Sequence, residues 1–251
     1  MALTSEPNAA RNTTDSDTST QAMIEQPTSK SSTIPTRYDL IVFDLDGTLS
    51  DPMQDVSRSI NYALKHYGYE ERESSELAQY IGPPLDQTFH ALTNSSQENV
   101  IRELVTKYRE RYSEVGFSEN ILYPGVSEAL LHLSESGVPM GVCTSKRKDF
   151  AEKILQMFGL SEFFQFVDAG DIGVEKWQQI AGLCEQGIVT PASIMIGDRA
   201  VDIIAAHKNG LQAAGVLWGY GSVAELESEH PEHLFTAPSE WSRLKGRSST
   251  L

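Results

Sequence analysis

The chain has 251 residues, about one and a half to two domains at the usual domain size. Its 35 acidic side chains outnumber its 20 Lys and Arg and leave a formal charge of −15, which argues against nucleic acid or an anionic membrane as a partner. No apolar run approaches the roughly 20 residues that span a bilayer, and two cysteines cannot form a disulfide framework, so we expect a soluble, acidic, cytoplasmic enzyme or binding protein.

Residues 1–36 differ in composition from the rest of the chain. Fourteen of them are Ser or Thr, and no aromatic residue precedes Tyr38. Because such a segment offers little apolar surface to bury, we expect a disordered tail. A targeting peptide is the alternative, but the segment lacks the apolar core of a secretory signal, and its acidic residues outnumber Arg11.

An apolar segment, residues 38–43, begins the ordered part of the chain. Five of its six residues are apolar or aromatic, which predicts a strand buried on both faces. Asp51 and Pro52 follow as the expected N-cap and first residue of a helix. From there to about residue 120 the pattern is helical, with an apolar stripe at Ile101, Leu104, Val105 and Tyr108.

After residue 125, predicted helices and strands alternate. Helices are expected at 126–136, 150–158, 176–186 and 201–209, and strands at 139–143, 164–167, 193–196 and 213–217. This alternation predicts an α/β fold, a Rossmann-like parallel sheet with helices on both faces. The core domain would comprise residues 37–50 and 122–251, with an all-helical domain, residues 51–121, inserted after the first strand.

Polar residues follow the ends of several predicted strands. Active sites of parallel sheets lie beyond the carboxyl ends of the strands, so we expect these residues to share one crevice. They are Asp44 and Asp46 after the first strand, Thr144, Ser145 and Lys146 after the second, and Asp198, with Asp202 four residues on, after the strand at 193–196.

Asp44 and Asp46 form an Asp-x-Asp-Gly sequence directly after a buried strand. Neighbouring carboxylates repel unless one is protonated or a cation lies between them, and Mg²⁺ prefers such oxygen ligands. A surface turn is the alternative, since Asp and Gly favour turns. A helix-loop-helix calcium site is excluded, because Leu49 and Asp55 stand where it needs Gly and Glu.

Three further features admit both a functional and a structural explanation. Asp198 and Asp202 have the spacing of one helix face, where like charges fit either a shared metal or a solvated helix start. Lys176 is the only Lys, Arg or His between Lys153 and Arg199, and it suits either a phosphate partner or the surface. Thr144 and Ser145 could bind an anion at a helix N-terminus or simply cap that helix.

Other features carry less weight. The loop 219–222 is glycine-rich, but too little chain follows it for a dinucleotide-binding unit. His230 and His233 have no Cys or third His nearby, which makes zinc improbable. Cys143 ends a buried strand, so packing is its expected role.

The sequence Asp44-Leu45-Asp46-Gly47-Thr48-Leu49 resembles the first motif of the haloacid dehalogenase (HAD) superfamily. Thr144, Lys176 and Gly197-Asp198 with Asp202 are similar to its second, third and fourth motifs, in the same order. The likeness extends from Tyr38 to about Trp241, and the helical insert resembles a four-helix cap. The segments 81–85 and 215–222 are similar to the phosphoglycolate phosphatase branch, although Trp177 stands where Pro commonly follows the third-motif Lys.

The resemblance implies a Mg²⁺-dependent phosphatase that acts on a small phosphorylated metabolite through an aspartyl phosphate. Asp44 would be the nucleophile and Asp46 the acid and base. Mg²⁺ would be held by Asp44, the Asp46 backbone carbonyl and Asp198, with Asp202 supporting the metal site. Thr144, the backbone at Ser145, and Lys176 would bind the phosphoryl group.

Several alternatives stay open within this resemblance: a 5′-nucleotidase, a sugar phosphatase or a β-phosphoglucomutase-type phosphomutase. A dehalogenase is disfavoured by the second acid, Asp46, and a metal-dependent glycosyltransferase would leave Lys176 and Asp198 without a role. A non-catalytic binding module is disfavoured because the whole acid set is present. We expect a monomer or small homo-oligomer.

Overall fold

The computed structural model describes residues 37–170 and 174–246, so the expected disorder of 1–36 lies outside the described residues. The core is a six-stranded sheet of order β6-β5-β2-β7-β8-β9, in which every neighbouring pair is parallel. The strands are β2 (Ile41–Phe43), β5 (Met140–Arg147), β6 (Val167–Gly170), β7 (Ile194–Gly197), β8 (Gln212–Val216) and β9 (His233–Phe235). The predicted parallel sheet is confirmed.

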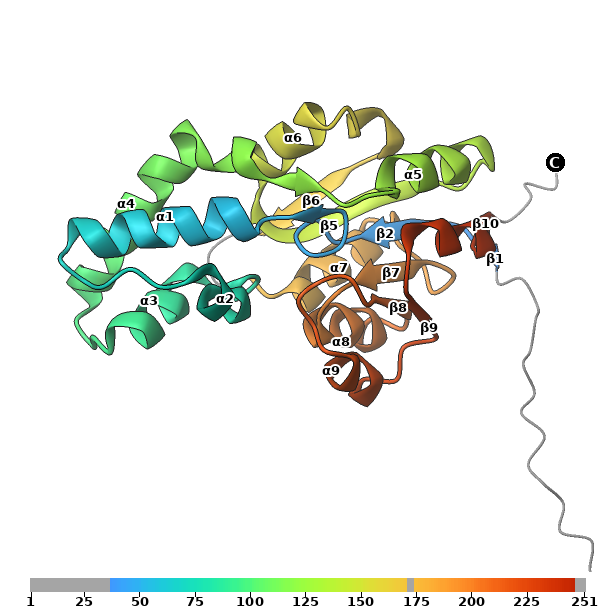
Figure 1. The fold of residues 1–251 in the computed structure, drawn as a ribbon. Helices are drawn as coiled ribbons and strands as arrows, with labels where there is room; N and C mark the ends of the chain where they lie inside the picture. Colours follow the sequence, from blue (N-terminus) through green and yellow to red (C-terminus); the bar gives the residue numbers. More distant parts are fainter. Residues whose placement is uncertain (1–36, 171–173, 247–251) are drawn as a thin grey trace, which may run out of the picture. The chain divides into compact units, whose positions relative to one another are not determined.

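Helices cover both faces of this sheet, as Figure 1 shows. Ile41 and Phe43 of β2 point to the face covered by α5 (Val126–Glu135) and α6 (Lys148–Met157). Val42 points to the other face, which is covered by α7 (Lys176–Glu185), α8 (Ala200–Lys208) and α9 (Val223–Ser228). All three β2 side chains are fully buried, which confirms the predicted strand and explains its unbroken apolar sequence.

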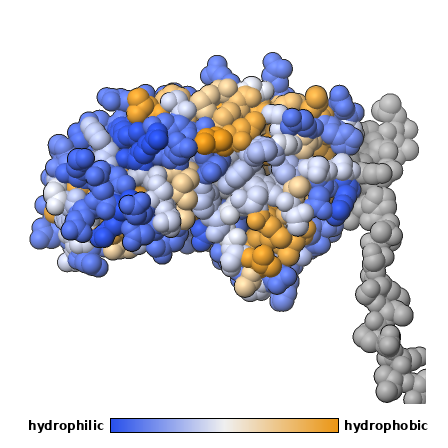
Figure 2. All heavy atoms as spheres, viewed as in Figure 1, coloured by the Kyte–Doolittle hydropathy of each residue, from blue (hydrophilic) through white to orange (hydrophobic). Residues whose placement is uncertain are grey.

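A helical cap is inserted between two short strands, β3 (Ser50–Asp51) and β4 (Ile121–Leu122), which pair antiparallel. Its helices are α1 (Met53–His66), α2 (Ser74–Leu77), α3 (Leu85–Thr93) and α4 (Glu98–Glu114). They pack around a second apolar cluster, which Phe150 of α6 also joins and to which the predicted stripe contributes buried Ile101, Leu104 and Tyr108. On the face shown in Figure 2, the surface over this cap is mostly hydrophilic.

The remaining elements are short. They are β1 (Arg37–Tyr38), β10 (Lys245–Gly246) and the 3₁₀ helices η1 (Ala78–Tyr80), η2 (Gly116–Glu119), η3 (Ser161–Phe163) and η4 (Pro238–Arg243). Strands β1 and β10 pair in parallel and form a separate two-stranded sheet. Within the described ranges, no helix is both long and apolar enough to cross a membrane.

Among the predicted boundaries that differ from those observed, two have a clear structural reason. The strand expected at 164–167 is assigned from Val167, although main-chain hydrogen bonds from Gln165 to Met140 and from Val142 to Phe166 already join this segment to β5. Helix α1 has Pro52 rather than Asp51 as its N-cap, because Asp51 belongs to β3. The Asp51 carboxylate still accepts a hydrogen bond of 2.9 Å from the Met53 N–H, so it satisfies one free donor of the helix.

Candidate active site

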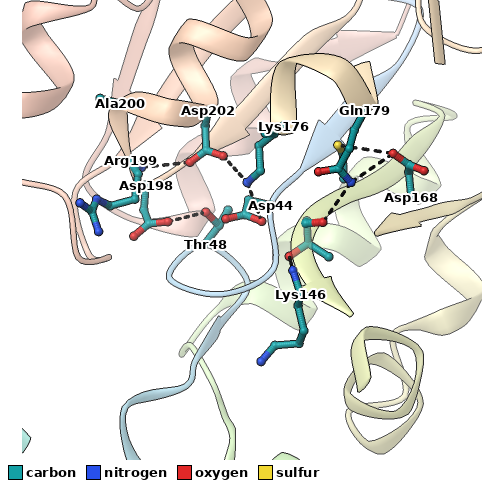
Figure 3. A network of polar contacts seen from close by, with 12 residues as sticks. Asp44, Thr48, Lys146, Asp168, Lys176, Gln179, Asp198, Arg199, Ala200 and Asp202 are labelled. Carbon is teal, nitrogen blue, oxygen red and sulfur yellow. Dashed lines mark hydrogen bonds and ion pairs between the residues drawn. The ribbon is translucent and has the colours of Figure 1, made fainter. Parts of the chain in front are cut away.

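Four charged side chains meet at the carboxyl end of the sheet (Figure 3). Asp44 follows β2, Asp198 follows β7, Asp202 lies in the first turn of α8 and Lys176 begins α7. They are between 0 and 6% exposed. Carboxylate oxygens of the three Asp residues lie within 4.8 Å of one another, so the structure brings Asp44 next to two acids that follow it by more than 150 positions in the chain.

Lys176 lies between two of these acids. Its Nζ is 3.0 Å from Asp44 Oδ1 and also pairs with Asp202 Oδ1. Burial alone would lower the pKa of Lys176, but the charges of Asp202 and Asp44 raise it above its ordinary value. The lone cation of this region is therefore a buried, charged ammonium paired with carboxylates, and a surface position is excluded.

Asp198 is held by hydrogen bonds rather than by a cation. Its Oδ2 accepts a bond of 2.8 Å from the Tyr220 N–H, and its Oδ1 accepts one of 3.4 Å from Thr48 Oγ1. No ion pair to Asp198 occurs among the residues that the structure describes. Burial, together with the charges of Asp202 and Asp44, raises its pKa well above the ordinary range.

Two glycines allow this close packing around Asp198. A Cβ at Gly47 would lie 2.2 Å from Asp198 Oδ2, and one at Gly219 would lie 2.3 Å from Asp198 Cβ. Gly219 and Tyr220 belong to the glycine-rich loop 219–222, whose contact with Asp198 is not predicted from the sequence. The glycines of this loop could have indicated such a contact, since glycine permits close approach of the backbone.

The prediction that Asp198 and Asp202 lie on the same face of one helix is wrong. Helix α8 starts at Ala200, so Asp198 lies in the loop before it. Asp202 Oδ2 accepts a hydrogen bond of 3.0 Å from the Arg199 N–H, which caps the helix, while its other oxygen pairs with Lys176. The two acids thus meet through the strand-to-helix turn and not through helical spacing.

The net charge of the buried cluster shows whether its residues could hold a metal ion. Three buried carboxylates face one ammonium, which leaves two negative charges in a region of low solvent exposure. Such a surplus is unfavourable without a counter-ion. A divalent cation that prefers oxygen ligands, such as Mg²⁺, would neutralise it. The donor set therefore fits the metal that the sequence predicts.

Asp46 points to a different cation. Its Oδ2 lies 2.9 Å from Lys146 Nζ, whereas its Oδ1 is buried and has no hydrogen-bond partner among the described residues. The two acids of the Asp-x-Asp sequence therefore have separate lysines, Lys176 for Asp44 and Lys146 for Asp46. The sequence places Lys146 at this strand end beside Thr144 and Ser145, but nothing in the sequence pattern assigns it a role.

Thr144 and Ser145 lie inside β5, which continues to Arg147. The expectation that they follow the strand and adjoin the N-terminus of the next helix is wrong, because the strand continues to Arg147 and α6 starts at Lys148. The ladder with β6 becomes irregular after Thr144. Thr144 is buried and its carbonyl accepts a hydrogen bond of 3.1 Å from Gln179 Nε2, while Ser145 is exposed. The neighbouring Cys143 is fully buried, which confirms its packing role.

Comparison with known proteins identifies the family of this chain. The profile of the haloacid dehalogenase-like hydrolase family matches residues 41–216. This chain belongs to that family. Among curated relatives of this hydrolase, a 5′-nucleotidase of Pseudomonas aeruginosa is 36% identical, over 78% of this chain and 90% of the relative. Phosphoglycolate phosphatase of Vibrio parahaemolyticus is 29% identical, over 80% and 93%.

A third relative has a different name. Tyrosine-protein kinase PtkA of Mycobacterium tuberculosis is 31% identical, over 72% of this chain and 63% of the relative. Among solved structures, a predicted phosphatase from Clostridium acetobutylicum is 30% identical, with a TM-score of 0.76 and coverage of 82% of this chain and 97% of that one. The family and its phosphatase members make this HAD hydrolase a phosphoric monoester hydrolase, similar to phosphoglycolate phosphatases.

Proposed function

We propose that this hydrolase is a Mg²⁺-dependent phosphatase that acts on a small phosphorylated metabolite through an aspartyl phosphate. The observation that carries the proposal is the buried cluster of Asp44, Asp198, Asp202 and Lys176, with Asp46 beside it on a separate lysine. One acid is thereby fixed in an anion-rich site suited to a metal. The other keeps a free oxygen for proton transfer.

The two acids divide the reaction between them. Asp44 attacks phosphorus, the ester P–O bond breaks, and the electron pair stays on the leaving oxygen, which takes a proton from Asp46. Asp46, now a carboxylate, removes a proton from water. That water attacks the phosphorus of the aspartyl phosphate, the bond to Asp44 breaks, and inorganic phosphate leaves with the Asp44 carboxylate restored.

The neighbouring groups would stabilise charge on the phosphoryl oxygens. Asp44, the main-chain carbonyl of Asp46, and Asp198 would hold Mg²⁺, which supplies positive charge next to those oxygens. Thr144, the backbone at Ser145, and the Lys176 ammonium would donate to them. Lys176 has three N–H donors, so it can reach phosphate while Asp202 keeps it in position.

For the substrate we propose a phosphoglycolate-like compound first and a nucleoside monophosphate second, following the names of the relatives. We assign the cap to residues 51–121, and it would set the choice by closing over the leaving group. We also propose a cytoplasmic monomer or small homo-oligomer. The test is phosphate release with Mg²⁺ from phosphoglycolate, sugar phosphates and nucleoside monophosphates, with ATP and a tyrosine peptide as a further arm because of the kinase relative.

The assignment of the two acids is tested by intact-mass spectrometry after mixing with p-nitrophenyl phosphate, whose leaving group needs no proton donor. Asp46→Asn should still phosphorylate Asp44 but hydrolyse the product slowly, so the added phosphoryl group accumulates. Asp44→Asn should gain no mass. Phosphorylation of the Asp44→Asn variant would show that the nucleophile is another residue.

A further inference from the structure

Lys146 connects the candidate acid and base to the cap. Besides its ion pair with Asp46, its Nζ donates a hydrogen bond of 2.5 Å to the hydroxyl of Tyr112 and lies 4.8 Å from the centre of that ring. Its side chain is 7% exposed. Tyr112 belongs to α4 of the cap, whereas Lys146 belongs to β5 of the core, so this contact joins the two parts at the site.

Tyr112 is held in turn by a buried acid on α1. Its hydroxyl donates a bond of 2.9 Å to Asp55 Oδ2, which also accepts one of 3.1 Å from Asn120 Nδ2. A hydroxyl has a single proton to donate, so its oxygen lone pairs remain free for the Lys146 ammonium. These contacts form a hydrogen-bonded series in which Lys146 donates to Tyr112 and Tyr112 donates to Asp55. A second N–H of the Lys146 ammonium faces Asp46.

The charges of this series favour a permanently charged lysine. Burial alone would lower the pKa of Lys146, but the charges of Asp46 and Asp55 raise it above its ordinary value. Lys146 engages only Oδ2 of Asp46, and the other oxygen, Oδ1, has no partner among the described residues. The ammonium thus fixes the orientation of the Asp46 carboxyl group through Oδ2 and leaves Oδ1 to carry the transferred proton.

We propose that Lys146 is a positioning residue for Asp46, held by Tyr112 and Asp55 of the cap. The inference rests on the proposed acid and base role of Asp46. It makes α1 and α4 contributors to proton transfer as well as to enclosure of the substrate. Without this series Asp46 would sample several rotamers, and transfer of a proton to the leaving oxygen would slow.

The alternative is that Lys146 binds an anionic group of the substrate. The two roles differ in their dependence on the leaving group. A positioning role slows phosphorylation by esters whose leaving group needs protonation, whereas a binding role weakens the binding of all esters alike. Phenyl phosphate and p-nitrophenyl phosphate are a suitable pair, because they are similar in shape but phenoxide is the more basic leaving group.

The experiment measures the pre-steady-state burst of phenol or nitrophenol release by the full-length protein in saturating Mg²⁺, which reports phosphorylation of Asp44 alone. We expect Lys146→Met to slow the burst with phenyl phosphate about tenfold more than with p-nitrophenyl phosphate, a fraction of the ~10²–10⁴ that acid catalysis supplies. Tyr112→Phe, which loses only the hydroxyl, should show the same selectivity to a smaller extent. The substrate concentration that gives half of the maximal burst rate reports binding, and it should stay unchanged in both variants.

A matched control lies on the same helix. Tyr108 is stacked on Tyr112 with ring centres 5.5 Å apart and is nearly as buried, but its hydroxyl makes none of the contacts of the series. Tyr108→Phe should behave as the unaltered protein. Asp55→Asn, which keeps an acceptor for Tyr112, should retain activity that Asp55→Ala loses. If Lys146→Met does not fold, the leaving-group selectivity of Tyr112→Phe is compared with that of Tyr108→Phe. The positioning role then requires that only Tyr112→Phe shows the selectivity.

Asp46→Asn serves as the reference. If it shows the leaving-group selectivity and the Lys146 and Tyr112 variants do not, the positioning role is wrong and the proposed function stands. A uniform rise in the substrate concentration at half of the maximal burst rate with Lys146→Met would also overturn that role, in favour of substrate binding. If Asp46→Asn itself shows no selectivity, the proposed role of Asp46 fails and this inference fails with it.

Discussion

The guanidinium of Arg199 donates a hydrogen bond of 3.0 Å to the main-chain carbonyl of Ile81. Arg199 directly follows Asp198 in the core, whereas Ile81 lies between η1 and α3 of the cap. The Nε of Arg199 pairs with Glu225 at 2.9 Å, which fixes the side chain from the opposite end. One residue therefore ties the loop that carries a candidate metal ligand to the cap.

Replacing Arg199 should weaken this tie. Arg199→Gln removes a charge-assisted hydrogen bond, and for a partly exposed group we expect a loss of about 1 kcal/mol, or roughly five- to tenfold in kcat/KM. Steady-state kinetics on the best substrate of the screen measures the change. The control is Arg58→Gln, which breaks an ion pair with Glu119 at 2.7 Å and leaves the Arg199 contacts intact. Equal losses in both variants would contradict a role for the Arg199 contact.

Gly47 should tolerate no side chain. Its φ is +85°, and an added Cβ would collide with the Asp198 carboxylate, so Gly47→Ala should lower kcat by about 100-fold or more by displacing that group. Gly68 is a matched control, since its φ is +78° but an added Cβ would meet no atom within 4 Å. Gly68→Ala should cost only about 1 kcal/mol of stability and leave kcat unchanged. Kinetics and thermal melts of both variants distinguish local strain from damage to the site.

Asp55 should make folding stability depend on pH. Burial raises its pKa from 3.8 to about 7, so the folded protein binds this proton more tightly than the unfolded chain does. Its contribution is fully present below pH 4 and is lost as the pH rises through 7, by at most about 4 kcal/mol. Urea unfolding of the unaltered protein and of Asp55→Asn at pH 5 and pH 8 measures it. Asp55→Asn should lose less stability over this interval, and parallel pH dependences would contradict the shift.

Mg²⁺ should stabilise the folded protein, because it offsets the two surplus negative charges of the cluster. At 100-fold excess over its dissociation constant, a ligand that binds only the folded state adds about 2.7 kcal/mol. Thermal melts with Mg²⁺ and with a chelator should therefore differ by several degrees. Asp198→Asn should reduce this difference and also raise the melting temperature without metal, since burial and nearby acids disfavour the Asp198 charge. A chelator that leaves both melting temperature and activity unchanged would refute the metal assignment.

The amino-acid sequence by itself determined the fold class and most of the candidate site. Local patterns are sufficient where burial on both faces dictates composition, as in β2, and where strand ends carry acids, as at Asp44 and Asp198. The three-residue strand β9 and the bounds of β6 could not be predicted from such patterns, because the formation of a short strand depends on the neighbouring strand with which it pairs.

The tertiary structure alone decided which charges pair. Asp44 and Asp46 are two residues apart, yet their lysines come from α7 and β5, and the partner that holds Lys146 comes from α4 of the cap. Nothing in the spacing of these residues encodes such contacts. They arise because parallel strands bring their carboxyl ends to one edge of the sheet, and because the cap then buries ammonium and carboxylate groups that must find partners there.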